Sequence, residues 1–272
     1  MTVAAPTVPR LVFVISRVIS VLCLVVLGLV AGFDAQAERF TAGRVPSEFA
    51  QRLDTDLAGD YRRVTVVAHN AGDDLGQATE AVANGVDAIE IDVRAAGDEL
   101  YASHDAPVPF LEDLVFRGPS LTDAWNVAQL RDTVLLHLKQ RSPRYLSDVR
   151  DFLASRPRPR VIVQTPDLAT LRVLRRTIPS AERLLLIFSG QALAQLRRDR
   201  EALRMIDGVS VRDSLLSATA QAWLQRRGLL TFAWTVNDER RMNELVARGA
   251  DGLITERVDI MQLLGEGGER TQ

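Results

Sequence analysis

The chain has 272 residues, 47% of them hydrophobic, and a formal net charge of −2. That length suits one large domain with a substantial core. The weak net charge argues against nucleic acid as a partner, because nucleic-acid binding usually needs a basic face. Of the 33 basic side chains only one is a lysine, Lys139, and the rest are arginines.

The first 37 residues predict an export signal. Arg10 and Arg17 precede an apolar run that ends in Ala35-Gln36-Ala37, a pattern that signal peptidases cut. An uncleaved membrane anchor is the alternative, since residues 11–33 are long enough to cross a bilayer. We therefore expect an exported protein that is secreted, periplasmic or membrane-anchored.

The only cysteine, Cys23, lies inside this apolar run. The mature chain would therefore contain no disulfide, although its destination is oxidising. A polar lead-in segment is expected over residues 38–62, before the folded part of the chain.

Short apolar runs alternate with amphipathic stretches over residues 63–264, and residues 265–272 follow as a tail. Such runs are typical of strands that are buried on both faces. Helical spacing of apolar residues predicts helices that include Leu168–Thr177, and an extra extended piece at Leu100–His104 predicts a hairpin. Eight strands that alternate with helices predict an α/β fold, a (β/α)₈ TIM barrel. The expected strands are Val64–Ala68, Ala88–Val93, Val134–Leu138, Arg160–Gln164, Leu184–Phe188, Gly208–Val211, Leu229–Val236 and Gly252–Thr255.

Two carboxylates lie at alternate positions of the second predicted strand, Glu90 and Asp92. Side chains at i and i+2 of a strand point to the same face, here expected to be the barrel interior. Buried paired carboxylates are costly unless a cation or a proton joins them, and a divalent metal ion is the simplest solution. If this strand were exposed instead, the two acids would simply be solvated.

All three histidines fall at or near predicted strand ends, where barrel enzymes place their chemistry: His69, His104 and His137. Histidine is the side chain best suited to move protons near neutral pH. The single lysine, Lys139, is two residues from His137, and its compact ammonium suits a phosphate oxygen. Alternatively, Lys139 only reaches outward to the rim of the barrel.

This ordered set of motifs resembles the glycerophosphodiester phosphodiesterase family over roughly residues 63–258. The family carries His-Arg-Gly, Glu-x-Asp, His-Asp, Glu-x-Lys and an aromatic-Thr-Val-Asn phrase, followed by a final strand. The corresponding residues are His69-Asn70-Ala71-Gly72, Glu90-Ile91-Asp92, His104-Asp105, His137-Leu138-Lys139, Trp234-Thr235-Val236-Asn237 and Gly249–Thr255.

The resemblance implies a role for each of eight residues. It implies acid–base catalysis by two histidines, a divalent metal ion held by three side chains, and substrate contacts from three more. The implied catalytic pair is His69 and His104, the implied ligands are Glu90, Asp92 and His137, and the expected substrate contacts are Lys139, Asn70 and Trp234. Alternatively, Trp234 only packs within the barrel. The family implies Mg²⁺ or Ca²⁺, whereas an imidazole ligand shifts the preference toward Mn²⁺ or Zn²⁺.

The chain departs from the family pattern in four places. Asn70 replaces the arginine after the first histidine, and His137 replaces the glutamate of Glu-x-Lys. The family's Pro-Glu-Asn-Thr phrase is absent between His69 and Glu90, and with it an acidic residue of the site. The segment between the His-Asp motif and the third predicted strand is also short.

We therefore expect a phosphoric diester hydrolase that uses a metal ion and two histidines, most simply on a glycerophosphodiester. One alternative is an enzyme similar to the phospholipase D and sphingomyelinase D-like branch of the same barrel fold, acting on a lysolipid or choline phosphodiester. A second is a non-catalytic protein that binds a phosphorylated head group. The expected partner is a small-molecule or lipid phosphodiester, with membrane association through residues 11–33 as a further expectation.

Overall fold

The computed structural model describes residues 64–106, 118–156 and 160–259. The predicted signal peptide or anchor, the lead-in segment and the tail at 265–272 lie outside these residues. Among the helices that are described, none has the length and apolar character needed to cross a bilayer.

Eight parallel strands form a closed barrel, as the sequence predicts. Each strand pairs with the next one in space, and β9 pairs back with β1, so the sheet has no free edge within the barrel. The predicted strands are confirmed with shifts of at most a few residues at their ends. The barrel strands are β1 (Thr65–Ala68), β2 (Ala88–Ala96), β4 (Thr133–Leu138), β5 (Arg160–Thr165), β6 (Glu182–Ile187), β7 (Gly208–Arg212), β8 (Leu230–Trp234) and β9 (Gly252–Thr255).

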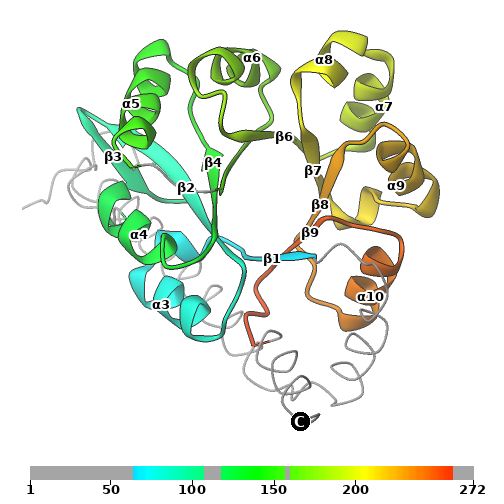
Figure 1. The fold of residues 1–272 in the computed structure, drawn as a ribbon, viewed down its shortest axis with the longest axis horizontal. Coiled ribbons are helices and arrows are strands. Elements are labelled where there is room, and N and C mark those ends of the chain that lie inside the picture. The colour runs from blue at the N-terminus through cyan, green and yellow to red at the C-terminus, as the bar shows by residue number, and fades with distance from the viewer. Residues whose placement is uncertain (1–63, 107–117, 157–159, 260–272) are drawn as a thin grey trace, which may run out of the picture. The chain divides into compact units, whose positions relative to one another are not determined.

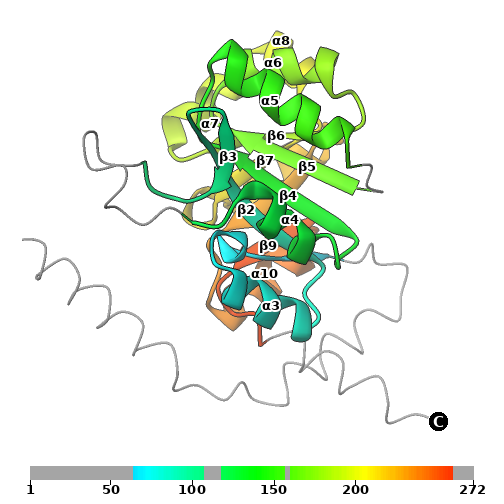
Figure 2. The ribbon, with the colours of Figure 1, turned by 90° about the vertical axis from the view of Figure 1, so that its left-hand side faces the viewer.

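Helices surround these strands as an outer ring (Figure 1). Helices α5, α6 and α8 cover one side of the barrel and α3 and α10 the opposite side (Figure 2). Each α-helix in the described ranges begins after a Ser or Asp whose side chain accepts a backbone N–H of the first turn, which fixes its start. The helices are α3 (Leu75–Ala83), α4 (Leu121–Ala128), α5 (Pro143–Ala154), α6 (Leu168–Thr177), α7 (Gly190–Arg198), α8 (Arg200–Met205), α9 (Ala218–Gln225) and α10 (Glu239–Ala247), with short 3₁₀ turns η2 (Ala71–Asp73) and η3 (Asp213–Leu215).

A layer of apolar side chains fills the barrel interior. Its buried members come from seven of the eight strands: Val67, Ala88, Leu135, Ile162, Leu184, Phe232 and Ile254. On the remaining strand Gly208 leaves the room that they need, because a Cβ there would lie 2.5 Å from the Leu230 Cβ. Side chains alternate along a strand, so the next inward position toward the carboxyl end follows two residues later. On β2, β4, β5 and β8 those positions hold Glu90, His137, Gln164 and Trp234.

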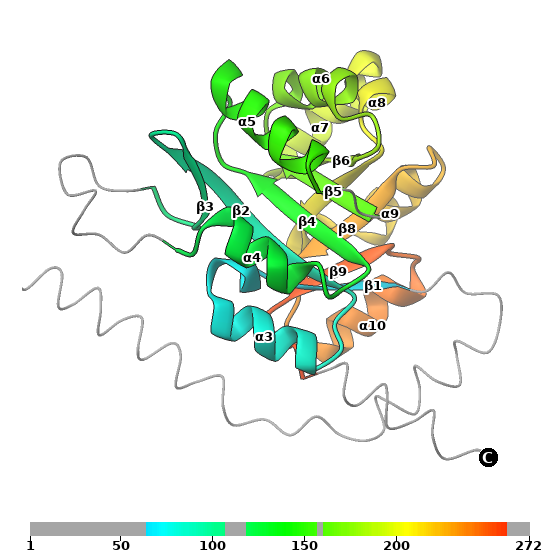
Figure 3. The same cartoon turned by 60° about the vertical axis from the view of Figure 1, so that its left-hand side comes forward.

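The strand β3 (Glu99–Ala102) forms a hairpin with the second half of β2. This hairpin extends beyond the barrel at one edge (Figure 3). It confirms the extended piece predicted at Leu100–His104, and it explains why β2 runs three residues further than predicted, since Ala96 pairs with Glu99. The chain then returns to the mouth of the barrel at Ser103 and His104.

Candidate functional site

A cavity of about 470 Å³ opens at the carboxyl ends of the barrel strands. Its lining includes seven of the eight residues singled out from the sequence: His69, Asn70, Glu90, His104, His137, Lys139 and Trp234. The eighth, Asp92, is fully buried and contacts both His137 and Lys139. The structure therefore brings the whole predicted set together at one mouth of the barrel.

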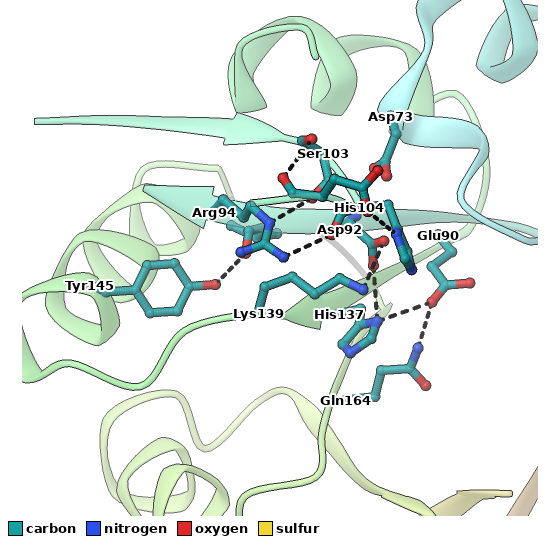
Figure 4. A network of polar contacts seen from close by, with 12 residues as sticks. Asp73, Glu90, Asp92, Arg94, Ser103, His104, His137, Lys139, Tyr145 and Gln164 are labelled. Atoms are coloured by element: carbon teal, nitrogen blue, oxygen red, sulfur yellow. Dashed lines mark hydrogen bonds and ion pairs between the residues drawn. The ribbon is translucent and has the colours of Figure 1, made fainter. Parts of the chain in front are cut away.

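Glu90, Asp92 and His137 each offer one ligand atom to a common point, and these atoms lie within 4.8 Å of one another. The Nδ1 of His137 is 2.9 Å from Asp92 Oδ1 and 3.8 Å from Glu90 Oε1 (Figure 4). Two carboxylates and one imidazole suit a divalent transition or alkaline-earth ion. Their role as metal ligands stays a prediction, but the donor set and its spacing fit such an ion.

Gln164 is a member of this cluster that the sequence analysis missed. Its Nε2 donates a 2.6 Å hydrogen bond to Glu90 Oε1, while Glu90 Oε2 is buried and has no hydrogen-bond partner among the described residues. Burial raises the pKa of Glu90, against the opposing effect of His69. One oxygen of Glu90 is thus held by an amide, and the other remains available to a cation or a proton.

Asp92 is held as an anion by its two basic neighbours. Lys139 Nζ lies 2.9 Å from Asp92 Oδ2 and His137 lies against the other oxygen. Burial alone would raise the pKa of Asp92, but the hydrogen bond from His137 and the charge of Lys139 outweigh it and place that pKa below its usual value. Lys139 is only 11% exposed, so it points into the site and does not reach outward to the rim.

Asp73 supplies a third carboxylate that the sequence analysis also missed. It lies in η2, four residues after His69, and its Oδ1 accepts a 2.9 Å hydrogen bond from the backbone N–H of Asp92. Burial, together with the charge of Asp92, raises the pKa of Asp73 to about 8. The family's acidic phrase is absent from the sequence, but a buried acid nevertheless lies beside the metal-binding candidates.

His69 is held by polar contacts with residues near the carboxyl ends of β8 and β9. Its backbone N–H donates to Thr255 O, and its Nδ1 lies 3.5 Å from Glu256 Oε1. Asn237 fixes this glutamate, because its amide nitrogen donates to Glu256 Oε2 at 2.8 Å and its oxygen accepts the Glu256 backbone N–H. Burial lowers the pKa of His69, but the hydrogen bond with Glu256 and the nearby Glu90 raise it above the ordinary value.

His104 lies at the rim of the cavity and is 62% exposed. Its Nδ1 is 2.8 Å from Asp105 Oδ1, which leaves Nε2 for another partner. The Arg94 side chain donates to the backbone oxygens of Ser103 and His104, so the loop after β3 is tied to β2 (Figure 4). Arg94, like Glu256, is thus a further residue that the sequence analysis did not single out.

The opposite wall of the cavity is aromatic. Trp234 packs edge-on against Phe188, with ring centroids 5.2 Å apart, and the Arg212 guanidinium lies 5.5 Å from the Trp234 ring centroid. Asn70 also lines the cavity, in the loop after β1. Its φ of 52° lies in the left-handed region, which asparagine tolerates better than most residues. The cavity therefore has a charged side from β1, β2 and β4 and an apolar side from β6 and β8.

Solved structures with the same fold include several phosphodiesterases. A phosphodiesterase from Oleispira antarctica, in complex with the product sn-glycerol-3-phosphate, is 17% identical, with a TM-score of 0.63 over 74% of this chain and 96% of that one. A glycerophosphodiester phosphodiesterase from Thermotoga maritima is 18% identical, with a TM-score of 0.55 over 74% and 97%. A putative glycerophosphoryl diester phosphodiesterase from Agrobacterium tumefaciens is 16% identical, with a TM-score of 0.63 over 75% and 98%. No curated protein matches the chain.

The sequence itself matches the glycerophosphoryl diester phosphodiesterase family over residues 96–260, more than half of the chain. The matched range contains His104, His137, Lys139 and Trp234. It begins after Glu90 and Asp92, whose place in the site rests on the geometry given above. The chain belongs to the glycerophosphoryl diester phosphodiesterase family, and it is a phosphoric diester hydrolase.

Proposed function

We propose that the protein hydrolyses a glycerophosphodiester with one divalent cation held by Glu90, Asp92 and His137. The observation that supports this most is the convergence of these three side chains, with Lys139 on Asp92, in the cavity that His69 and His104 also line. When bound, the cation would stabilise the negative charge that develops on the phosphoryl oxygens.

The charges of the site suit a singly charged diester. Glu90 and Asp92 contribute two negative charges and Lys139 one positive charge, while the raised pKa of Asp73 leaves that acid mostly protonated at neutral pH. With a divalent cation these groups sum to one net positive charge, which a phosphodiester anion neutralises, while Glu256 offsets the charge of a protonated His69. Lys139 would then place its ammonium near a non-bridging oxygen.

The two histidines have different surroundings, and we assign them different roles. The raised pKa of His69 favours its protonated form, which suits donation of a proton to the leaving alkoxide. The exposed His104 would accept the proton of the attacking hydroxyl. Glu256 and Asn237 would hold the His69 ring so that Nε2 faces the substrate, which makes them positioning residues.

A choline phosphodiester is the alternative substrate, and the aromatic wall argues against it. Aromatic faces bind quaternary ammonium groups, but the face of Trp234 already has the Arg212 guanidinium near it. A second cation there would be repelled. We therefore favour a diester whose alcohol group is uncharged or negatively charged, with Phe188 and Trp234 packing against its carbon atoms.

We also propose that residues 1–37 direct export and are removed after Ala37. The charged start, apolar run and Ala-x-Ala ending are the basis of this proposal. Protein purified from its native host should have an intact mass that begins at Glu38. A mass that retains residues 11–33, found in the membrane fraction, would replace cleavage by anchoring, and a full-length mass in the soluble cytoplasmic fraction would contradict export altogether.

Turnover of glycerophosphoglycerol, glycerophosphocholine, lysophosphatidylcholine and bis(p-nitrophenyl) phosphate across Mg²⁺, Ca²⁺, Mn²⁺ and Zn²⁺ tests the proposed reaction. We expect glycerophosphoglycerol, whose alcohol group is uncharged, to be preferred over both choline diesters, and glycerophosphocholine to be preferred over the lysolipid. His69→Ala and His104→Ala should each lower kcat by at least ~10²-fold, the usual size of a general acid or base contribution. Circular dichroism melts should change little, because both residues lie at the mouth of the barrel. Near-normal turnover in both variants would show that the two-histidine mechanism is wrong.

The role of Glu256 can be tested by Glu256→Gln, which keeps the shape of the side chain but removes its charge. Because Glu256 raises the pKa of His69, this variant should titrate His69 at lower pH, as followed by NMR of the imidazole carbons. If His69 is the proton donor, the alkaline limb of the kcat/KM profile should move to lower pH, and turnover should fall by less than the ~10²-fold expected for loss of His69 itself.

Glu244→Gln is a matched control for this experiment. Glu244 is also 42% exposed and pairs with basic side chains, but on α10 and away from His69. This control should leave the His69 titration and the pH profile unchanged. An unchanged His69 titration in Glu256→Gln would remove Glu256 from the mechanism.

Replacing His137 tests the ligand set. His137→Glu restores three carboxylates, so it should tighten binding of Mg²⁺ and Ca²⁺ relative to Zn²⁺ in calorimetry. In the native protein metal affinity should weaken as pH falls, because protons compete with the metal ion for the ligand atoms.

His137→Gln serves as the comparison variant, since it removes the imidazole without adding a charge. It should weaken binding of every divalent ion tested. If the native protein binds no divalent ion at neutral pH, or if His137→Glu leaves the relative affinities unchanged, the proposed metal site is wrong.

A further inference from the structure

A second cavity, of about 860 Å³, lies at the opposite end of the barrel. It is lined by the ends of α7 and α9, by α8, and by Leu229, which directly precedes β8. These segments lead into the amino ends of β7 and β8, whereas the candidate active site lies at the carboxyl ends of the strands. The two cavities share no lining residue.

Arginine dominates this second cavity. Six exposed arginines line it together with two leucines, and no acidic side chain does: Arg197, Arg198, Arg200, Arg204, Arg226 and Arg227. Within the described residues none of the six forms an ion pair with a carboxylate. Other arginines on neighbouring elements do have such partners, as in Arg172–Glu201 at 2.8 Å and Arg183–Asp207 at 2.7 Å.

The acids nearest in sequence are already engaged elsewhere. Asp199 accepts the backbone N–H of Ala202 and caps α8, and Glu201 pairs with Arg172 on α6. The carboxyl ends of α7 and α9 offset part of the positive charge, but a helix end is equivalent to only about half a charge. Two helix ends therefore neutralise about one of six charges, and the cavity remains strongly positive.

The arginines are partly fixed in place. The half-buried Trp223 lies between two of them, with the guanidinium of Arg227 4.5 Å and that of Arg197 5.3 Å from its ring centroid. Arg175 donates to the backbone oxygen of Arg204, which ties α6 to α8. Leu203 and the buried Leu229 form an apolar part of the lining. The ring contacts limit the freedom of the Arg197 and Arg227 guanidinium groups and so lower the entropy that a ligand must remove.

We propose that this cavity, which we call the arginine cavity, binds a ligand with two or more phosphate groups, either a free oligophosphate or the head groups of anionic lipids. Guanidinium groups match phosphate oxygens in a bidentate geometry. The cavity exceeds the space of a single phosphate, and six charges gathered in one hollow suit a compact multivalent anion better than an extended one. The net charge of −2 for the whole chain does not oppose this, because the positive charges are concentrated locally.

Calorimetric titration of the full-length protein with tripolyphosphate, at low ionic strength and without metal ions, tests the free-ligand source. The variant R198E/R226E should bind at least ~10-fold more weakly, because it replaces two attractive charges with two repulsive ones. The matched control R144E/R240E reverses two exposed arginines in the first turns of α5 and α10, at the opposite end of the barrel, and should change affinity less than ~2-fold. Lys139→Ala should leave this binding intact, which separates it from the candidate active site.

Co-sedimentation with vesicles tests the lipid source. Vesicles of phosphatidylglycerol mixed with phosphatidylcholine should retain the mature protein, which begins at Glu38, and its R144E/R240E control, but not its R198E/R226E variant. Pure phosphatidylcholine should retain none of them. Binding in only one of the two experiments identifies the source. If R198E/R226E does not fold, as judged by its thermal melt, the uncharged variant R200Q/R204Q takes its place. The proposal is wrong if neither probe binds, or if binding persists in the folded variants or is lost only in Lys139→Ala.

Discussion

The pair of carboxylates inside the barrel, Glu90 and Asp92, is the constraint on which the rest of the site depends. Each ion taken out of water costs several kcal/mol unless opposite charge and hydrogen bonds compensate it. The neighbouring strands supply that compensation: β4 places His137 and Lys139 against Asp92, and β5 places Gln164 against Glu90. The order of the strands therefore decides which residues can stabilise the pair.

The buried charges of the two carboxylates are not compensated equally, so their pKa values shift in opposite directions. Both oxygens of Asp92 have a basic neighbour, so its pKa is low and it stays charged. Glu90 has an amide on one oxygen and no hydrogen-bond partner in the described structure on the other, so burial raises its pKa. A cation in the site would lie beside Asp92, which is already ionised, and Glu90, which would lose its proton as the cation binds. Binding of the cation and ionisation of Glu90 are therefore coupled.

His137 affects how a cation would bind in this site. A carboxylate at this position, as in the family pattern, would add a third negative charge beside Asp92. Imidazole adds none, and its Nδ1 already lies 2.9 Å from Asp92 Oδ1. Ligation through Nδ1 would require that contact to be given up, so Asp92 and a metal ion compete for the same nitrogen atom. Asp73, which accepts the Asp92 backbone N–H, holds a further ionisable oxygen beside the pair.

The sequence predicts the barrel well because its strands are fully buried and therefore read as continuous apolar runs, as in Val134–Leu138. It also places Glu90 with Asp92, since strand alternation is a local rule. It does not predict contacts between residues that are distant in the sequence and meet only in the folded barrel. Gln164 follows three apolar residues of β5, Asp73 lies in the 3₁₀ turn η2, and Glu256 reaches His69 only because β9 pairs with β1. No local pattern carries such contacts.

Closure of the barrel also places the charged wall and the aromatic wall of the cavity in different halves of the chain. Consecutive strands are spatial neighbours, so β1 to β5 contribute the charged wall of the cavity and β6 to β8 the aromatic wall. One contact between the two ends of the chain is at the seam, where Glu256 after β9 lies 3.5 Å from His69 after β1. Under the proposed function, changes in Phe188, Arg212 or Trp234 would therefore alter the fit of the alcohol group without disturbing the buried charges. The charged half has no such freedom, because every change there must again balance Glu90 and Asp92.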